Sequence, residues 1–216
     1  MQKDTYRHIG MRRKMVEDLM TQGISDELVL KAMLGVPRHF FFDNAFVEKA
    51  YENRAFPIGE KQTISHPYTV AHQSSLLQLK PGMKVLEVGT GSAYQACVLS
   101  AMGMKVVTIE RFRSLYEQSN YLIRKMKYPN ITTLFGDGFE GAKLHAPFDR
   151  ILVTAAAPHV PQALLQQLKI GGIMVIPLGD GEVQKMLRIT KKNDIAFIKE
   201  EGDDFRFVPM LKGKVF

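Results

Sequence analysis

The sequence predicts an α/β fold built on a doubly wound, mostly parallel sheet. Two observations predict it. An apolar run over residues 85–88 ends at closely spaced glycines, Gly89 and Gly91, and helix-forming residues follow at once. Beyond this turn, apolar β-rich runs alternate with helical segments. We therefore expect one domain over residues 1–216, with a helical cap in 1–80 and the sheet core in 81–216.

The helical cap is predicted from periodicity in residues 4–55. Apolar side chains recur at helical spacing, and those that show it best are Met11, Met15, Val16, Leu19 and Met20. Ser25 and Asp26 can cap a second helix that runs to Leu34 and is stopped by Gly35 and Pro37. These residues predict two consecutive helices ahead of the sheet.

Residues 56–66, which include Pro57 and Gly59, are expected to form a loop. Pro67 suits the first turn of another helix, which should run to about Leu79. The breaker Lys80-Pro81-Gly82 follows it and separates the cap from the sheet core.

The sheet core is predicted from the alternation after residue 82. We expect strands at 84–88, 105–109, 131–135, 149–154 and 172–177, and helices near 93–102, 113–126 and 161–168. The tail differs, because three short β runs at 186–190, 195–199 and 205–210 follow one another without a helix. We expect these runs to be antiparallel strands at one edge of the sheet.

The composition excludes several classes of protein. Cys97 is the single cysteine and lies in an apolar run, so we expect a buried structural thiol and no disulfide within the chain. No stretch approaches the ~20 apolar residues that cross a bilayer, and the charged N-terminus does not resemble a signal peptide. We expect a soluble, cytoplasmic protein without a membrane partner, and a monomer.

The net charge of +7 does not by itself indicate a nucleic-acid partner. The basic residues are scattered, and the densest clusters, at 12–14 and 191–192, are short. They do not form a stripe interleaved with aromatic residues. We expect them to be solvated helix and hairpin faces, and we expect no nucleic acid to bind.

The glycine turn and two carboxylates indicate a cofactor that contains a nucleoside. Glu110 ends the next apolar run, roughly 20 residues past the glycines, where such folds place the carboxylate that binds two ribose hydroxyls. Glu87 would oppose an anionic pyrophosphate and suits a cofactor with positive charge. Tyr94 stands where the nicotinamide pattern has its third glycine. These residues favour S-adenosylmethionine, which has an ammonium, a sulfonium and no phosphate, over NAD.

Asp137 and Gly138 follow the third apolar run of the sheet core. The carboxyl end of a strand in an open α/β sheet faces the ligand crevice, so Asp137 could accept a hydrogen bond from the adenine amino group. The alternative is a simple Asp-Gly turn.

Segments along nearly the whole chain resemble the protein-L-isoaspartate O-methyltransferase family. They are 36–38 (VPR), 57–59 (PIG), 62–68 (QTISHPY), 85–95 (VLEVGTGSAYQ), 153–158 (VTAAAP) and 206–209 (RFVP). The segments before and after the glycine turn are more specific than the turn itself, which other methyltransferases share. One departure is Ala93, where the family usually has glycine; we expect little effect unless this position needs a positive φ.

The resemblance implies a Rossmann-like methyltransferase sheet and a defined reaction. A methyl group would pass from S-adenosylmethionine to the α-carboxylate of an L-isoaspartyl residue in a damaged protein or peptide, leaving S-adenosylhomocysteine. The methyl ester would then close to a succinimide, from which repair proceeds. Residues 1–80 would carry the cap and the substrate segment.

We assign the site residues as follows. Cofactor contacts are expected from Glu87, Gly89, Thr90, Gly91, Ser92, Glu110, Arg111, Asp137 and Gly138. Ser65 is expected to orient the substrate carboxylate; the alternative is that it only caps the helix that begins near Pro67. Ile58, Thr63 and Val208 lie in short segments of extended character that could offer main-chain groups to an extended peptide.

The chemistry requires neither a general base nor a metal. A carboxylate with a pKa near 4 is already ionised at pH 7. The six histidines do not fall at metal-ligand spacing, so no metal site is expected.

Four other functions remain as alternatives at this point. A nucleic-acid methyltransferase is disfavoured, since the chain lacks the Asn/Asp-Pro-Pro-Tyr/Phe segment that binds the target amine. Only the family resemblance distinguishes the predicted activity from that of a small-molecule carboxyl methyltransferase. Tyr94 and Glu87 disfavour a nicotinamide oxidoreductase. The intact glycine turn and Ser65 argue against a non-enzymatic module that binds S-adenosylmethionine.

Overall fold

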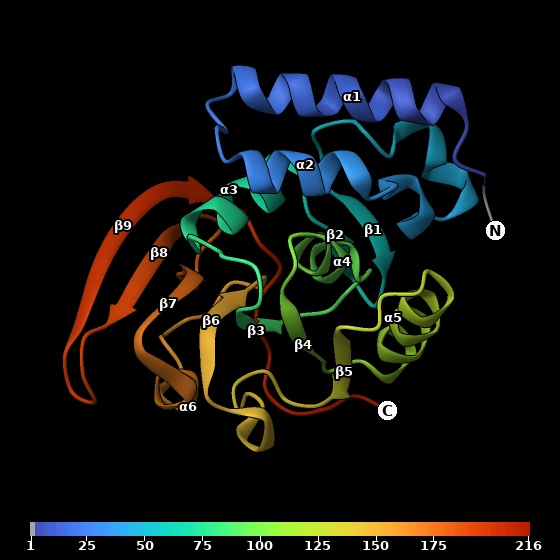
Figure 1. Cartoon of the computed structure of the whole chain (residues 1–216). Helices are drawn as coiled ribbons and strands as arrows, with labels where there is room; N and C mark the ends of the chain where they lie inside the picture. Colours follow the sequence, from blue (N-terminus) through green and yellow to red (C-terminus); the bar gives the residue numbers. More distant parts are fainter. Residues whose placement is uncertain (1–2) are drawn as a thin grey trace.

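A seven-stranded sheet runs through the computed structural model, which describes residues 3–216, in the order β5-β4-β3-β6-β7-β8-β9 (Figure 1). Its strands are β3 (Lys84–Val88), β4 (Lys105–Glu110), β5 (Ile131–Phe135), β6 (Phe148–Val153), β7 (Leu168–Leu178), β8 (Gln184–Lys191) and β9 (Phe197–Phe205). The first five are parallel, and β8 and β9 are antiparallel additions. The predicted fold class is confirmed.

The strand order reverses at β3, which has β4 on one side and β6 on the other. In open α/β sheets this switch point leaves a crevice at the carboxyl ends of the strands. The glycine turn follows β3 directly, so the chain places it at this crevice.

Side chains alternate between the two faces of the sheet and form two cores. In β3, Val85 belongs to one cluster, while Leu86 and Val88 belong to the other. The first core also contains side chains of α3 (Pro67–Leu76), α4 (Tyr94–Ala101) and α5 (Arg113–Lys125); the second contains those of α6 (Gln162–Gln167). This two-sided burial explains why the central strands are nearly continuous apolar runs.

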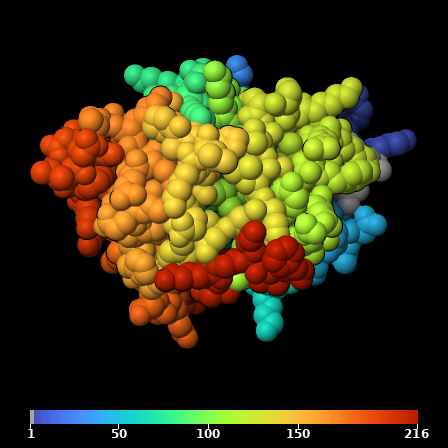
Figure 2. Space-filling model, turned by 90° about the horizontal axis from the view of Figure 1, so that it is seen from below, coloured from blue at the N-terminus to red at the C-terminus, as the bar shows by residue number. Residues whose placement is uncertain are grey.

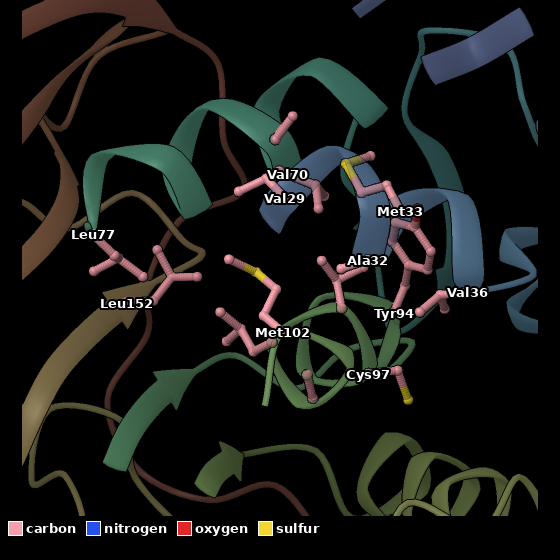
Figure 3. Close-up of a cluster of buried hydrophobic side chains, with 14 of the residues drawn as sticks. Val29, Ala32, Met33, Val36, Val70, Leu77, Tyr94, Cys97, Met102 and Leu152 are labelled. Carbon is pink, nitrogen blue, oxygen red and sulfur yellow. The ribbon is translucent and has the colours of Figure 1, made fainter. Parts of the chain in front are cut away.

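The helical cap consists of α1 (Tyr6–Thr21), α2 (Glu27–Gly35) and two 3-10 turns, η1 (Arg38–Phe41) and η2 (Asn44–Lys49). Asp26 caps α2 by accepting hydrogen bonds from the amides of Leu28 and Val29, as predicted. The cap packs on α4, where side chains of α2 surround Tyr94 (Figure 3). Cys97 lies in this core, and burial raises the pKa of its thiol well above the ordinary value.

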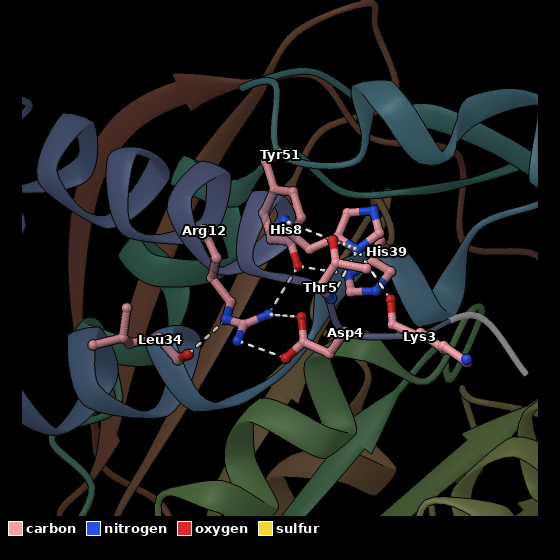
Figure 4. A network of polar contacts seen from close by, with 8 residues as sticks. All are labelled: Lys3, Asp4, Thr5, His8, Arg12, Leu34, His39 and Tyr51. Atoms are coloured by element: carbon pink, nitrogen blue, oxygen red, sulfur yellow. Dashed lines mark hydrogen bonds and ion pairs between the residues drawn. The ribbon is translucent and has the colours of Figure 1, made fainter.

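A polar network holds the start of the chain against the cap (Figure 4). Arg12 is buried and donates to both carboxylate oxygens of Asp4, at 3.1 and 2.9 Å, and to the Tyr51 hydroxyl at 3.0 Å. The ring of His39 lies 2.7 Å from that hydroxyl and stacks on His8 at a centroid distance of 3.9 Å. The cap is thus tied together by buried polar contacts as well as by apolar packing.

Residues 56–66 are not the expected loop. They contain a short antiparallel hairpin, β1 (Phe56–Gly59) and β2 (Gln62–Ile64). Its turn places Glu60 and Lys61 at φ values of 50° and 56°. Such turns usually carry Asn or Gly, so Glu-Lys offered no signal for a hairpin.

The tail also departs from the prediction. Two antiparallel strands form instead of three. The first run belongs to β8, and the middle run lengthens into β9. The third run, 205–210, is not a strand of the sheet; beyond Phe205 it turns away and crosses the carboxyl ends of the parallel strands. Among the helices of residues 3–216, none combines the length and the apolar character needed to span a membrane.

Candidate active site

A cleft opens at the predicted crevice, at the carboxyl ends of β3, β4 and β6. Its empty space is about 830 Å³ with the open solvent at its mouth counted. The cleft is lined by the β2–α3 segment, the glycine turn, the start of α5 and the tail. Of the predicted cofactor residues, seven line it: Gly89, Thr90, Gly91, Ser92, Glu110, Arg111 and Gly138. Ser65, Thr63 and Val208 line it too.

Two glycines are required by the geometry of the cleft. Gly89 has a φ of 100°, and a Cβ there would lie 2.5 Å from the Thr154 hydroxyl oxygen. A Cβ on Gly138 would lie 2.4 Å from a methyl carbon of Val88. Side chains at these positions would be strained or would displace the wall, so the turn can present bare backbone to a ligand.

Glu110 supports the glycine turn from β4. One carboxylate oxygen accepts from the amide of Gly91 at 2.9 Å, and the other accepts from Arg111 and Phe112 at 2.8 and 3.0 Å. A carboxylate has about four acceptor sites, so it can still accept a ligand hydroxyl. Its fixed place in the cleft wall is compatible with the predicted ribose contact.

Glu87 lies beneath the turn and is not among the residues that line the cleft. Thr108 donates to its Oε2 at 2.6 Å, and Thr90 lies 2.6 Å from the Thr108 hydroxyl. Within residues 3–216, its Oε1 has no hydrogen-bond partner. Burial raises the pKa of Glu87 to about 8. The predicted contact of Glu87 with a cationic cofactor stays a prediction, but the position has an unused acceptor.

Asp137 is occupied by contacts within the chain. Its two oxygens accept from the amides of Phe139 at 2.9 Å and Gly213 at 2.6 Å, and its side chain does not line the cleft. The adenine contact predicted for Asp137 stays a prediction. In this structure Asp137 anchors the C-terminal tail beside Gly138.

The tail covers one side of the cleft. The amide of Ala156 donates to Val208 at 2.8 Å, and that of Met210 donates to Ala156 at 2.7 Å. Further on, the Arg111 guanidinium donates to the carbonyls of Lys212 and Gly213 at 3.0 and 3.1 Å. Figure 2 shows these C-terminal residues, in red, lying across the face below the sheet. The run expected to be an edge strand therefore forms part of the cleft wall.

Ser65 lines the cleft just before α3. The residue that precedes this helix as its N-cap is His66, and no side chain caps it. The alternative that Ser65 only caps the helix is therefore wrong. The Ser65 hydroxyl makes no hydrogen bond to any residue in 3–216, so it is free to bind a ligand in the cleft.

Arg38 supports Ser65 from the cap. Its guanidinium donates to the Ser65 carbonyl at 2.7 Å and to the Ala50 carbonyl at 2.8 Å. It lies over the rings of Tyr94 and Phe42, 4.7 and 5.3 Å from their centroids. Arg38 is fully buried, which lowers its pKa to about 10, so it stays cationic at pH 7.

Sequence reasoning missed several parts of the site. Arg38 lies in a segment that carries the family resemblance, but no residue near it in the sequence indicated its hydrogen bond to Ser65, which is 27 residues away. The substrate contact predicted for Ile58 stays a prediction; its Cδ1 lies 3.2 Å from where a Gly91 Cβ would be. Lining residues that were not assigned include Tyr94, Phe112, Thr154 and Met210.

Comparison with known proteins gives a consistent result. The family model described as protein-L-isoaspartate(D-aspartate) O-methyltransferase matches residues 11–215. A protein-L-isoaspartate O-methyltransferase of Cytophaga hutchinsonii is 56% identical over 209 residues, which is 97% of this chain and 94% of that protein. One from Christiangramia forsetii is 51% identical over 212 residues, covering 98% of this chain and 99% of that protein.

Solved structures agree with the fold. A structure named protein-L-isoaspartate O-methyltransferase superimposes with a TM-score of 0.84 at 29% identity, over 92% of this chain and 65% of that longer chain. A Plasmodium falciparum structure in complex with S-adenosyl-L-homocysteine has a TM-score of 0.82 at 28% identity, over 94% of this chain and 99% of that one.

Proposed function

The chain belongs to the protein-L-isoaspartate(D-aspartate) O-methyltransferase family, and we propose that Ser65 orients the substrate in its reaction. The enzyme transfers a methyl group from S-adenosylmethionine to the α-carboxylate of L-isoaspartyl residues in damaged proteins and peptides. This methylation begins repair through a succinimide. The assignments of individual residues to cofactor and substrate are our proposal.

The cleft fits S-adenosylmethionine by its shape and its charges. The turn at Gly89 brings bare backbone to the ligand, and Glu110 has acceptor capacity left for ribose hydroxyls. Beneath the turn, the Oε1 of Glu87 has no partner within residues 3–216; with a pKa of about 8 the group is neutral at pH 7, so it adds a polar atom and no negative charge. An anionic pyrophosphate would meet the Glu110 carboxylate, while Arg111, the basic residue of the lining, already donates to the carbonyls of the tail. This donor set therefore favours the cationic cofactor.

The bound cofactor supplies an electrophilic methyl group on a sulfonium. The acceptor carboxylate is already ionised at neutral pH, so the chain need not provide a base. Because an anion and a cation react to give neutral products, water stabilises the reactants more than the transition state. Residues that exclude water and align the carboxylate should therefore provide most of the acceleration. Tyr94, Val208 and Met210 line the cleft and can exclude water.

One observation carries the proposed role of Ser65. Its hydroxyl is without a partner in residues 3–216, and it faces the same cleft as the glycine turn and Glu110. A hydroxyl that donates to one carboxylate oxygen leaves the other free to point at the methyl group. Arg38 holds the Ser65 backbone in place while this occurs.

The substrate backbone has a candidate partner in the tail. The carbonyl of Val208 accepts from Ala156, but its amide donates no hydrogen bond within the described residues. An extended peptide could therefore pair with this amide, with Thr63 on the facing segment. We propose that the enzyme acts as a monomer and needs no nucleic-acid partner, because its basic residues are scattered along the sequence and form no stripe interleaved with aromatic residues.

The test is transfer of radiolabelled methyl from S-adenosylmethionine to two matched peptides, one with an L-isoaspartyl residue and one with the normal aspartyl residue. Base-labile label on the isoaspartyl peptide alone is expected. Equal labelling of both peptides, or none on either, would contradict the activity.

A further inference from the structure

A second, smaller cavity lies beside the cleft and shares part of its wall. Its empty space, about 290 Å³ with the open solvent at its mouth counted, is smaller than the 830 Å³ of the cleft measured in the same way. Thr63, Ser65, Thr154 and Val208 line both spaces. A carboxylate held at Ser65 for methylation therefore has this side cavity as its immediate neighbour.

The side cavity carries one unpaired positive charge. Arg206 lines it and is exposed, and within residues 3–216 the guanidinium makes no ion pair and no hydrogen bond. Its lining includes no aspartate or glutamate. The nearby Asp204 forms an ion pair with Lys185 at 2.7 Å. Glu200 forms a separate ion pair with Arg188. Arg206 is thus available to an anion from outside the chain.

The other polar groups around the cavity are also free. The hydroxyls of Thr63 and Thr69 make no hydrogen bond among the described residues, whereas that of Ser65 is assigned to the acceptor carboxylate and that of Thr154 donates to the carbonyls of Val88 and Gly89. The ring of His66 completes the wall. Burial, and then the charge of Arg38, lower its pKa, so at pH 7 it is neutral. Free hydroxyls and one guanidinium match a carboxylate.

The geometry of the substrate indicates where a carboxylate that could enter the side cavity would come from. In an isoaspartyl residue the main chain continues through the side-chain carbonyl, and the α-carboxylate is a branch. When that branch lies at Ser65, the chain continues past it in both directions. An extended chain advances about 3.3 Å per residue, so the side chain of a residue next to the isoaspartyl can enter the cavity.

We propose that the side cavity is a subsite for an acidic side chain adjacent to the isoaspartyl residue, with Arg206 binding its carboxylate. The subsite rests on the proposed function, since it recognises the same substrate at the neighbouring position. It makes Arg206 a specificity residue that acts on peptide affinity and leaves the methyl-transfer step unchanged.

The test uses matched isoaspartyl peptides that carry Glu, Gln or Lys at one neighbouring position, with one set for each side of the isoaspartyl residue. The enzymes are the wild type, Arg206→Gln, Arg206→Glu and the control Arg124→Gln, which removes an exposed arginine of α5 remote from the cavity. In one of the two sets, the wild type should show a KM about two- to fivefold lower for the Glu peptide than for the Gln peptide, the effect of one exposed ion pair.

The variants give the decisive result. Arg206→Gln should abolish this preference with kcat unchanged, Arg206→Glu should reverse it toward the Lys peptide, and Arg124→Gln should keep it. Equal kcat/KM for all peptides on the wild type, or a preference that survives in Arg206→Gln, would overturn the subsite while leaving the methyltransferase activity intact. If no isoaspartyl peptide is methylated by any of the enzymes, the proposed function itself fails.

Discussion

Arg38 and Ser65 are joined by a hydrogen bond of 2.7 Å from the buried guanidinium to the serine carbonyl. The bond connects the helical cap to the segment that carries the candidate orienting hydroxyl. Because the same guanidinium lies over the ring of Tyr94 at the start of α4, it also contacts the helix that follows the glycine turn. The cap therefore supports the active-site wall from behind, although none of its described residues lines the cleft.

Replacing Arg38 with Met should lower both stability and turnover. The carbonyls of Ser65 and Ala50 would lose their donors inside the protein, which we expect to cost about 2 kcal/mol of unfolding free energy. The folded fraction should also turn over more slowly, because Ser65 loses its support. Urea unfolding and kcat per folded enzyme measure the two effects.

Arg12→Met is the matched control. Arg12 is also a buried arginine of the cap, but its partners are Asp4, Tyr51 and the Leu34 carbonyl, none of which lines the cleft. This variant should lose stability while the kcat of the folded enzyme is preserved. If Arg38→Met behaves in the same way, Arg38 has only a structural role.

Replacing Ser65 with Ala should slow methyl transfer with little other effect. A hydrogen bond to a charged group contributes about 1.5–3 kcal/mol, so kcat should fall by roughly 10- to 100-fold. The melting temperature and the Kd for S-adenosylmethionine should not change, since the hydroxyl has no partner in the described chain. The control Ser75→Ala removes a hydroxyl that bonds the Ala71 carbonyl in α3 and should leave kcat intact. Full turnover by Ser65→Ala would refute the orienting role.

Replacing Ala93 with Gly should raise stability slightly. The family usually has glycine at this position, and alanine matters there only if the backbone needs a positive φ. It does, because Ala93 has a φ of 72° at the start of α4. A left-handed conformation costs a non-glycine residue about 1–2 kcal/mol, and the lost burial of one methyl offsets part of the relief. We expect a gain of up to about 1 kcal/mol in urea unfolding. Ala96→Gly, within the helix, should have the opposite sign; a loss of stability in both variants would show that strain at Ala93 is unimportant.

Glu87 should make stability fall as pH rises. Burial raises its pKa to about 8 in the folded chain, against 4.5 for the exposed group. Between these values the folded state retains a proton that the unfolded state has lost, so the unfolding free energy declines with increasing pH.

Glu87→Gln mimics the protonated form and should lose this decline without a change below about pH 4.5. Unfolding free energies from pH 4 to 9 measure it; parallel curves for the two proteins would mean that Glu87 is ionised when folded. Glu117→Gln, on exposed α5, should leave the wild-type decline in place.

The elements of the core were predictable because their signals are local. Apolar runs marked the five parallel strands, and Gly89 with Glu110 marked the crevice at the end of β3. The hairpin at 56–64 was missed because Glu60 and Lys61 adopt positive φ without a typical turn residue. The tail was assigned to the sheet edge because an extended segment that covers a cleft has the same local pattern as a strand.

The sequence by itself determined the fold class, the family and ten of the residues that line the cleft, since periodicity, glycine spacing and ordered motifs are properties of neighbouring residues. Only the tertiary structure decided that Arg38 supports Ser65, that Asp137 anchors the tail at Gly213 and that Arg206 is unpaired beside the acceptor site. These relationships join segments that are far apart in the chain. Their energies come from burial and hydrogen-bond geometry, which exist only once those segments have packed together.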